Sequence, residues 1–173
     1  MNQSDRIVQF EKLMGDIVSE EMIDKLVYDG FFIAPASTKY HGNYEGGLFD
    51  HSFAVAKCLQ ELTERNDLEW ADKRSPLLVG MFHDICKIDQ YIQNSLCYDY
   101  NPDTLIKGHG DKSVMLLSEY FKLTMEEIMC IRYHMGAFTD KTEWNDYTRA
   151  VHNYTNVLWT HQADMMASHV LGV

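Results

Sequence analysis

Apolar residues recur at helical spacing along most of the chain, and turn-forming residues separate the runs. The pattern predicts short helices over residues 3–14 and 19–29, the second ending at Gly30. Residues 31–35 are expected to form an extended connection. Residues 36–47 contain three glycines and should form a loop, long enough to take part in a site.

The next two predicted helices each place a polar side chain on an apolar face. On a helix over residues 48–65, His51 shares one face with Val55, Cys58, Leu59 and Leu62. Ser75-Pro76 is interpreted as an N-cap followed by an N1 proline that opens another helix. On that helix, Asp84 shares a stripe with Leu77, Met81, Ile85 and Ile88. An unpaired carboxylate there would be costly, so a metal ion is its simplest partner.

The middle of the chain interrupts the helical pattern once. Residues 91–107 are mixed in character and are expected to form a small hairpin or an irregular lid. A helix follows over residues 111–121. The capping box that starts at Thr124 opens the next helix, which carries His134.

Two further helices are expected near residues 145–154 and 157–170, and the last carries Asp164. The predicted fold class is therefore all-α. The length of 173 residues fits one domain, and residues 1–173 are expected to form a single helical bundle with the small hairpin as an insertion.

Composition narrows the classes of partner. The formal net charge is −11, from 15 basic and 26 acidic residues, which argues against long nucleic acid as a partner because phosphate contacts supply most of that affinity. A small anionic substrate stays compatible, since bound metal ions would dominate the local field. Without a long apolar run or a signal pattern, we expect no membrane association and a cytoplasmic location. Four cysteines without a CxxC pair fit reduced thiols there.

The candidate chemistry lies in a series of histidines and aspartates, which are His51, His83, Asp84, His109, His134 and Asp164. Successive members are separated by 32 (83 − 51), 26 (109 − 83), 25 (134 − 109) and 30 (164 − 134) residues, each about one helix plus a loop. Successive helices could therefore each direct one ligand to a common centre. Imidazole nitrogens and carboxylate oxygens are the groups that bind divalent metals.

Taken singly, each of these residues could be a hydrogen-bonded core residue instead. The chain has eight histidines, and four of them stay outside the set: His41, His152, His161 and His169. Three features favour a cluster. His83 and Asp84 are adjacent on the predicted helix, about 100° apart. His109 lies between two glycines, and Asp164 lies among small and apolar residues. One metal cluster would explain these inward polar groups together.

Five segments in this order resemble those of a known family. They are Gly46-Gly47-Leu48-Phe49-Asp50-His51-Ser52, Phe82-His83-Asp84-Ile85-Cys86-Lys87, Gly108-His109-Gly110, Arg132-Tyr133-His134 and Gln162-Ala163-Asp164. The chain resembles the HD superfamily of metal-dependent phosphohydrolases, in the subgroup whose ligand set reads H…HD…H…H…D. The loop over residues 35–41 is similar to that in the HD domain of bacterial 3′-to-5′ exoribonucleases. No segment of this sequence matches the nucleic-acid-binding OB domain of those enzymes.

The resemblance implies two divalent metal ions, which could be Fe, Mn, Mg, Ni or Zn. One ion would be held by His51, His83, Asp84 and Asp164. The other would be held by Asp84, His109 and His134, so that Asp84 bridges the pair. A hydroxide between the metals would attack phosphorus in a phosphoester or phosphoanhydride of a nucleotide-like substrate.

Asp84 and Lys87 are the candidate catalytic residues. Lys87 lies one helical turn after His83 and could reach a phosphate or the bridging carboxylate. The alternative is a solvated lysine on the far face of the helix. Further candidates for substrate contact, each with a plain surface role as the alternative, are Lys39, His41, Tyr44 and Lys112.

Two other functions stay open at this point. Some relatives with the same ligand set are di-iron oxygenases acting on a small polyol or phosphonate. The ligands alone do not separate these from hydrolases, because the identity of the metal and the groups around its ligands decide the chemistry. The third reading is a non-catalytic nucleotide-binding module. The retention of every ligand position argues against it. The sequence leaves the oligomeric state open.

Overall fold

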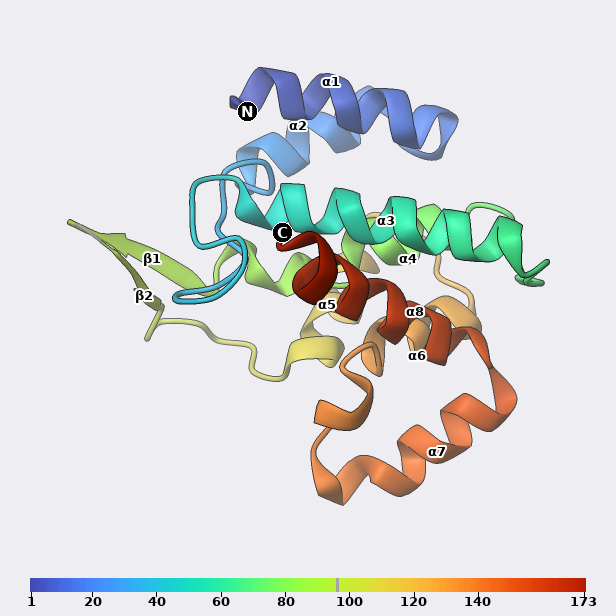
Figure 1. The fold of residues 1–173 in the computed structure, drawn as a ribbon. Coiled ribbons are helices and arrows are strands. Elements are labelled where there is room, and N and C mark those ends of the chain that lie inside the picture. The colour runs from blue at the N-terminus through green and yellow to red at the C-terminus, as the bar shows by residue number, and fades with distance from the viewer. Residues whose placement is uncertain (96) are drawn as a thin grey trace.

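The computed structural model describes residues 1–95 and 97–173 (Figure 1). Helical segments, among them eight α-helices, make up most of this part of the chain, and its one sheet is a two-stranded hairpin, so the all-α prediction is confirmed. The helices are α1 (Gln3–Met14), α2 (Glu20–Tyr28), α3 (Gly47–Arg65), α4 (Ser75–Phe82), α5 (His109–Leu117), α6 (Met125–Arg132), α7 (Trp144–Asn153) and α8 (Asn156–Met165). No helix among the described residues is both long and apolar enough to cross a membrane.

The N-terminal region completes the hydrophobic core. Helix α1 packs on α3 and α4, and Phe10 of α1 lies in a cluster of buried aromatic rings. The prediction of an extended connection over residues 31–35 is wrong for residues 31–33. Gly30 has a left-handed φ of 87°, and Ala34 N donates to Gly30 O at 2.9 Å, so residues 31–33 form a tight turn instead. This turn buries Phe31 and Phe32 fully.

A buried arginine ties α1 to the start of α3. The guanidinium of Arg6 contacts both carboxylate oxygens of Asp50, at 3.0 and 3.1 Å, and donates to the carbonyl of Glu45. Gly46 has a φ of 80°, and a Cβ there would lie 2.1 Å from the Arg6 guanidinium carbon. The glycine at this position therefore lets the arginine approach the turn that precedes His51.

The close packing of α3 on α4 brings together two ligand candidates, His51 on α3 and His83 directly after α4. A Cβ on Gly80 of α4 would lie 2.5 Å from the Cα of Ala56 on α3, so the two helices are in backbone contact there.

Ser75 is not the predicted N-cap. It is the first residue of α4, it accepts no capping hydrogen bond from the helix start, and its hydroxyl donates to Glu127 Oε1 at 3.0 Å.

The helix predicted to run through His83 and Asp84 is shorter than expected. Helix α4 ends at Phe82, and Asp84 has non-helical angles (φ −107°, ψ 15°) before a 3-10 turn over Ile85–Ile88. His83 and Asp84 therefore lie at the junction of two elements. The two side chains do face one centre, as predicted, but from this junction and not from a continuous helix.

The segment after this junction forms the predicted hairpin. Strands β1 (Tyr91–Asn94) and β2 (Cys97–Tyr100) pair antiparallel, with Tyr91 opposite Tyr100. The hairpin projects away from the helices (Figure 1). The two tyrosine rings at its base lie 5.4 Å apart.

The remaining helices follow the predictions with shifted ends. Helix α5 begins at His109, two residues before the predicted start, and ends at Leu117, four residues early. The capping box of Thr124 and Glu127 is confirmed at α6. His134 lies in the turn after α6 and not on the helix. Helix α8 continues as a π-helix over Met166–Leu171, which packs against α3.

Candidate metal centre

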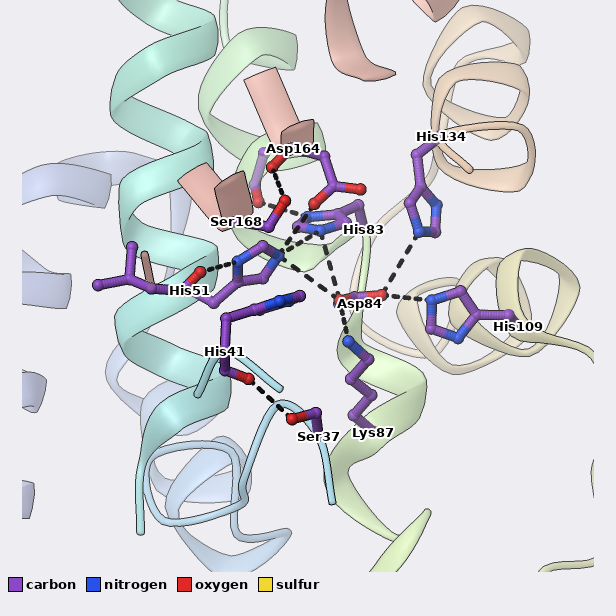
Figure 2. Close-up of polar contacts among 12 residues, drawn as sticks. Ser37, His41, His51, His83, Asp84, Lys87, His109, His134, Asp164 and Ser168 are labelled. Carbon is purple, nitrogen blue, oxygen red and sulfur yellow. Dashed lines mark hydrogen bonds and ion pairs between the residues drawn. The ribbon is translucent and has the colours of Figure 1, made fainter. Parts of the chain in front are cut away.

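The six histidines and aspartates singled out in the sequence converge on one centre (Figure 2). They come from α3, from the α4 junction, from the start of α5, from the turn after α6 and from α8. The side chains of His51, His83 and His134 are fully buried, and that of Asp84 nearly so. Buried polar groups need partners, and here they have mainly each other.

Asp84 lies between two groups of ligand candidates. Its Oδ2 faces His51 and His83, whose Nε2 atoms lie 3.7 and 3.5 Å away. Its Oδ1 faces the other side, where the Nε2 atoms of His109 and His134 lie 2.6 and 3.4 Å away. Asp164 joins the first group, with Oδ1 3.2 Å from His51 Nε2. Figure 2 shows this division of the ligands around Asp84.

The ends of two helices orient two of the histidines. His83 Nδ1 lies 2.8 Å from the carbonyl of Gly80, and His134 Nδ1 lies 2.6 Å from that of Ile131. The last carbonyls of a helix have no partner within it and are free to accept such bonds. Because a carbonyl can only accept, each Nδ1 carries the proton, and each Nε2 presents its lone pair to the centre.

The other two histidines are held from elsewhere in the chain. His51 Nδ1 lies 3.0 Å from the carbonyl oxygen of Val173. His109 Nδ1 lies 3.1 Å from Cys86 Sγ. All four rings therefore occupy Nδ1 with an outer partner and direct Nε2 inward, which is the arrangement that orients metal-binding histidines.

The centre fits divalent cations. Three groups of ligand atoms, each with all members within 4.8 Å of one another, occur here: His51–His83–Asp84, His83–His134–Asp164 and Asp84–His109–His134. Among the described residues, Asp84 Oδ1 and His134 Nε2 are buried without an aligned hydrogen bond. Two buried acceptors that face one another in this way would both be satisfied by a cation between them. A mixed nitrogen and oxygen donor set suits zinc, iron, manganese and similar ions.

Burial and opposite charges set the protonation of the centre. Burial lowers the pKa of His83 to about 3, so its ring stays neutral. Burial opposes ionisation of Asp84, but Lys87 and then His109 outweigh it and hold the pKa of Asp84 well below its usual value. The pKa of Asp164 is also lowered; burial raises it, but contact with His51 and the nearby rings of His83 and His134 together outweigh burial. Ionised carboxylates and neutral imidazoles are the forms that bind metals.

Lys87 is buried beside the carboxylate of Asp84 and is not a solvated lysine. Its Nζ lies 2.6 Å from Asp84 Oδ2. Burial lowers the pKa of Lys87, but the charge of Asp84 and its contact outweigh this, so the pKa is raised and the group is a cation. Lys87 also borders the open side of the centre.

A cavity of about 360 Å³ opens beside the centre and reaches Asp84, His109 and Asp164. Its other polar lining comes from His41, Lys87, Gln90, His161, Ser168 and His169. Its apolar lining comes from Tyr91, Met135, Phe138 and Met165. A second cavity of about 650 Å³ shares His41, Lys87 and Phe138 with it and extends towards Tyr40 and Tyr100. The size and mixed lining are those of a small-molecule site.

Of the predicted substrate contacts Lys39, His41, Tyr44 and Lys112, His41 is the one that lines these two cavities. His41 lines both cavities, and its ring lies 5.0 Å from that of His51. Lys39 is exposed on the loop and lines neither cavity. Tyr44 lies beside Asp50 and not at the centre; burial, and then Asp50, raise its pKa. Lys112 is buried and pairs with Asp89, and it lines a separate cavity together with His109.

Several residues at the centre were not among the predicted site residues. His161, on the same face of α8 as Asp164, bonds the carbonyl of His134 at 2.9 Å, and this spacing was visible in the sequence. The positions of Cys86, Met135 and Phe138 had no such signal, because each reaches the site through a turn. Their spacing in the chain does not show where a turn directs a side chain.

The comparisons with known proteins place this centre in a family. The family model described as HD domain matches residues 48–164, a range that contains all six converging residues. Since this is more than half of the chain, the protein belongs to the HD domain family. HD domains bind divalent metals and are typically metal-dependent hydrolases. A search of curated proteins and a search of solved structures each find no match.

Proposed function

We propose that this protein is a phosphohydrolase of the HD subgroup with the H…HD…H…H…D ligand set, and that it cleaves a phosphoester or phosphoanhydride of a small nucleotide-like molecule. The observation that carries the proposal is that the two carboxylate oxygens of Asp84 face different groups of histidines. One carboxylate oxygen faces His51 and His83, and the other faces His109 and His134. A carboxylate that offers one oxygen to each of two histidine groups is arranged to bridge two cations.

The residues divide into two binding sites. His51, His83, Asp84 and Asp164 would hold one divalent ion, and Asp84, His109 and His134 the other. Such ions supply Lewis acidity, which makes water nucleophilic at neutral pH and neutralises phosphoryl oxygens. The buried rings exclude bulk water on the inner side, and the cavity gives a substrate access to Asp84, His109 and Asp164.

Lys87 supports phosphate as the reacting group. Its ammonium group lies at the boundary between the centre and the cavity, and contacts Asp84 at 2.6 Å. A buried cation at this place can bind a phosphoryl oxygen and at the same time keep the bridging carboxylate ionised. An oxygenase acting on a neutral polyol has no evident need for this charge.

The cavity supports a nucleotide-sized substrate. The apolar side chains of Tyr91, Met135 and Phe138 line one part of it, and can cover a planar or hydrophobic group. His41 and Ser168 line the polar part and can bond to hydroxyl or phosphate oxygens. With a formal charge of −11, the protein as a whole would repel long polynucleotides.

The test combines metal analysis with a substrate screen. Elemental analysis of the purified protein should find up to two divalent ions per chain. Phosphate or nucleotide release should then be measured on nucleotides, dinucleotides and short oligonucleotides with manganese, magnesium or iron. Asp84→Asn should lose the activity, whereas Asp24→Asn, an exposed aspartate on α2, should retain it. Oxygen consumption on a polyol or phosphonate without phosphate release from nucleotides would refute the hydrolase and favour the oxygenase.

A further inference from the structure

The four histidines of the centre are oriented by acceptors of different origin. His83 and His134 follow the ends of helices and bond to carbonyls three residues earlier in the chain. His51 lies in the second turn of α3, near the helix start. The main-chain groups that stay free near a helix start are N–H donors, which cannot accept a proton from imidazole. His51 therefore needs an acceptor from outside its own helix.

That acceptor lies 122 residues further along the chain. The carbonyl oxygen of Val173 is 3.0 Å from His51 Nδ1. The segment that brings it there starts on α8, which carries Asp164, and continues through the π-helix over Met166–Leu171. Figure 1 shows the C-terminal end of the drawn chain beside α3, where the π-helix packs. One continuous segment thus supplies Asp164 to the centre and the outer partner of His51.

Gly172 is the C-cap of the π-helix. It has a left-handed conformation with φ 77° and ψ 25°, and after it Val173 N donates back to Ala167 O at 3.2 Å. A Cβ on Gly172 would meet no atom within 4 Å. A substitution there would therefore act through the backbone conformation and not through a collision. β-Branched residues strongly disfavour a positive φ, whereas asparagine tolerates it.

We infer that the segment from Met166 to Val173 sets the affinity of one half of the centre, by holding the ring of His51 through the Val173 carbonyl. The half affected is the one formed by His51, His83, Asp84 and Asp164. The inference rests on the proposed function, since it requires that this half binds a cation. Gly172 and Val173 are positioning residues, which fix the tautomer and orientation of His51 and increase its basicity.

The test is a titration of the metal-free protein with Mn²⁺, with free ion measured by electron paramagnetic resonance. Gly172→Val should bind one Mn²⁺ as the wild type does, and the second about 10- to 100-fold more weakly, the usual effect of losing an outer partner. Gly172→Asn should bind both ions like the wild type. Gly15→Val is the matched control. Gly15 also has a positive φ, and a Cβ added there would also meet no atom within 4 Å, but this glycine caps α1 and is distant in sequence from the residues of the centre.

The same substitution made in a second variant, His134→Ala, shows which half of the centre is affected. His134→Ala should leave the half that contains His51 as the single strong site, and adding Gly172→Val should weaken that remaining ion. Unchanged binding in Gly172→Val would overturn the inference, as would an equal loss in Gly15→Val or in Gly172→Asn. A wild-type protein that binds no Mn²⁺ would instead refute the proposed function, and the inference would fail with it.

Discussion

The Nε2 atoms of His51 and His83 lie 3.3 Å apart, and each ring already directs its Nδ1 at a main-chain carbonyl. With each Nδ1 facing a carbonyl, the Nε2 of each ring directs its lone pair at the other ring. Asp84 Oδ2 lies close to both and adds negative charge. The arrangement is unfavourable by itself, and a cation at this point would relieve it.

Metal removal should therefore lower the stability of the protein. An ion present at 100 times its Kd stabilises the folded state by about 2.7 kcal/mol, which for a chain of this length raises the Tm by about 5 to 10 °C. Thermal unfolding with and without chelator, and after adding back manganese, measures the difference. The Tm of the Asp84→Asn variant should change neither with chelator nor with added manganese. A wild-type Tm that does not respond to chelator would contradict metal binding at this centre.

His134→Ala should empty one half of the centre selectively. Its Nε2 faces Asp84 Oδ1, on the side opposite His51 and His83. Metal counting should fall from two ions per chain to one, and kcat/KM should fall by more than the roughly 10- to 100-fold that loss of an outer partner costs. His152→Ala, an exposed histidine on α7, should bind two ions. Two tightly bound ions in both variants would exclude His134 as a ligand.

Lys87→Met should weaken substrate binding and not metal binding. Methionine fills a similar volume but removes the cation that contacts Asp84. Loss of a hydrogen bond to a charged phosphate costs about 1.5 to 3 kcal/mol, so kcat/KM should fall about 10- to 100-fold. Metal affinity should not decrease, because the carboxylate loses a competing cation. Lys12→Met, at an exposed position on α1, is the control, and kinetics equal to it would assign Lys87 a structural role only.

The metal-free protein should lose stability in mild acid through His83. Burial lowers the pKa of this ring from 6.5 to about 3 in the folded state. Between these values the unfolded chain binds a proton that the folded chain does not, so the free energy of unfolding falls as the pH falls. Urea unfolding from about pH 7 to about pH 4 should show this slope, and His83→Gln should flatten it. An identical slope in that variant would contradict the assignment.

His134 should have the opposite effect in the same measurement. Contact with Asp84 outweighs burial and raises its pKa in the folded state. The stability that it contributes is fully present below its unfolded pKa, and is lost as the pH rises through the folded pKa. His134→Gln should therefore make the fall in stability towards acid steeper than in the wild type. A shallower fall in this variant would show that its pKa is not raised.

Helix positions and the set of candidate ligands could be predicted from the sequence because they depend on near neighbours. The apolar face of α3, the capping box at Thr124 and the hairpin at Tyr91 each follow from residues within a few positions of one another. The chemistry of histidine and aspartate is likewise a property of the residue itself. The prediction that Ser75 caps α4 failed because the helix already begins at Ser75, whose hydroxyl donates to Glu127, 52 residues away.

Contacts between distant segments could not be predicted in this way. No periodicity shows that α4 ends at Phe82 so that Asp84 can divide its oxygens between two groups of histidines. Neither does it pair Arg6 with Asp50, or place the carbonyl of Val173 against His51. Each of these depends on how packed helices and turns direct their ends in space. A main-chain carbonyl also looks alike at every residue, so only the folded chain selects the one that orients a ligand.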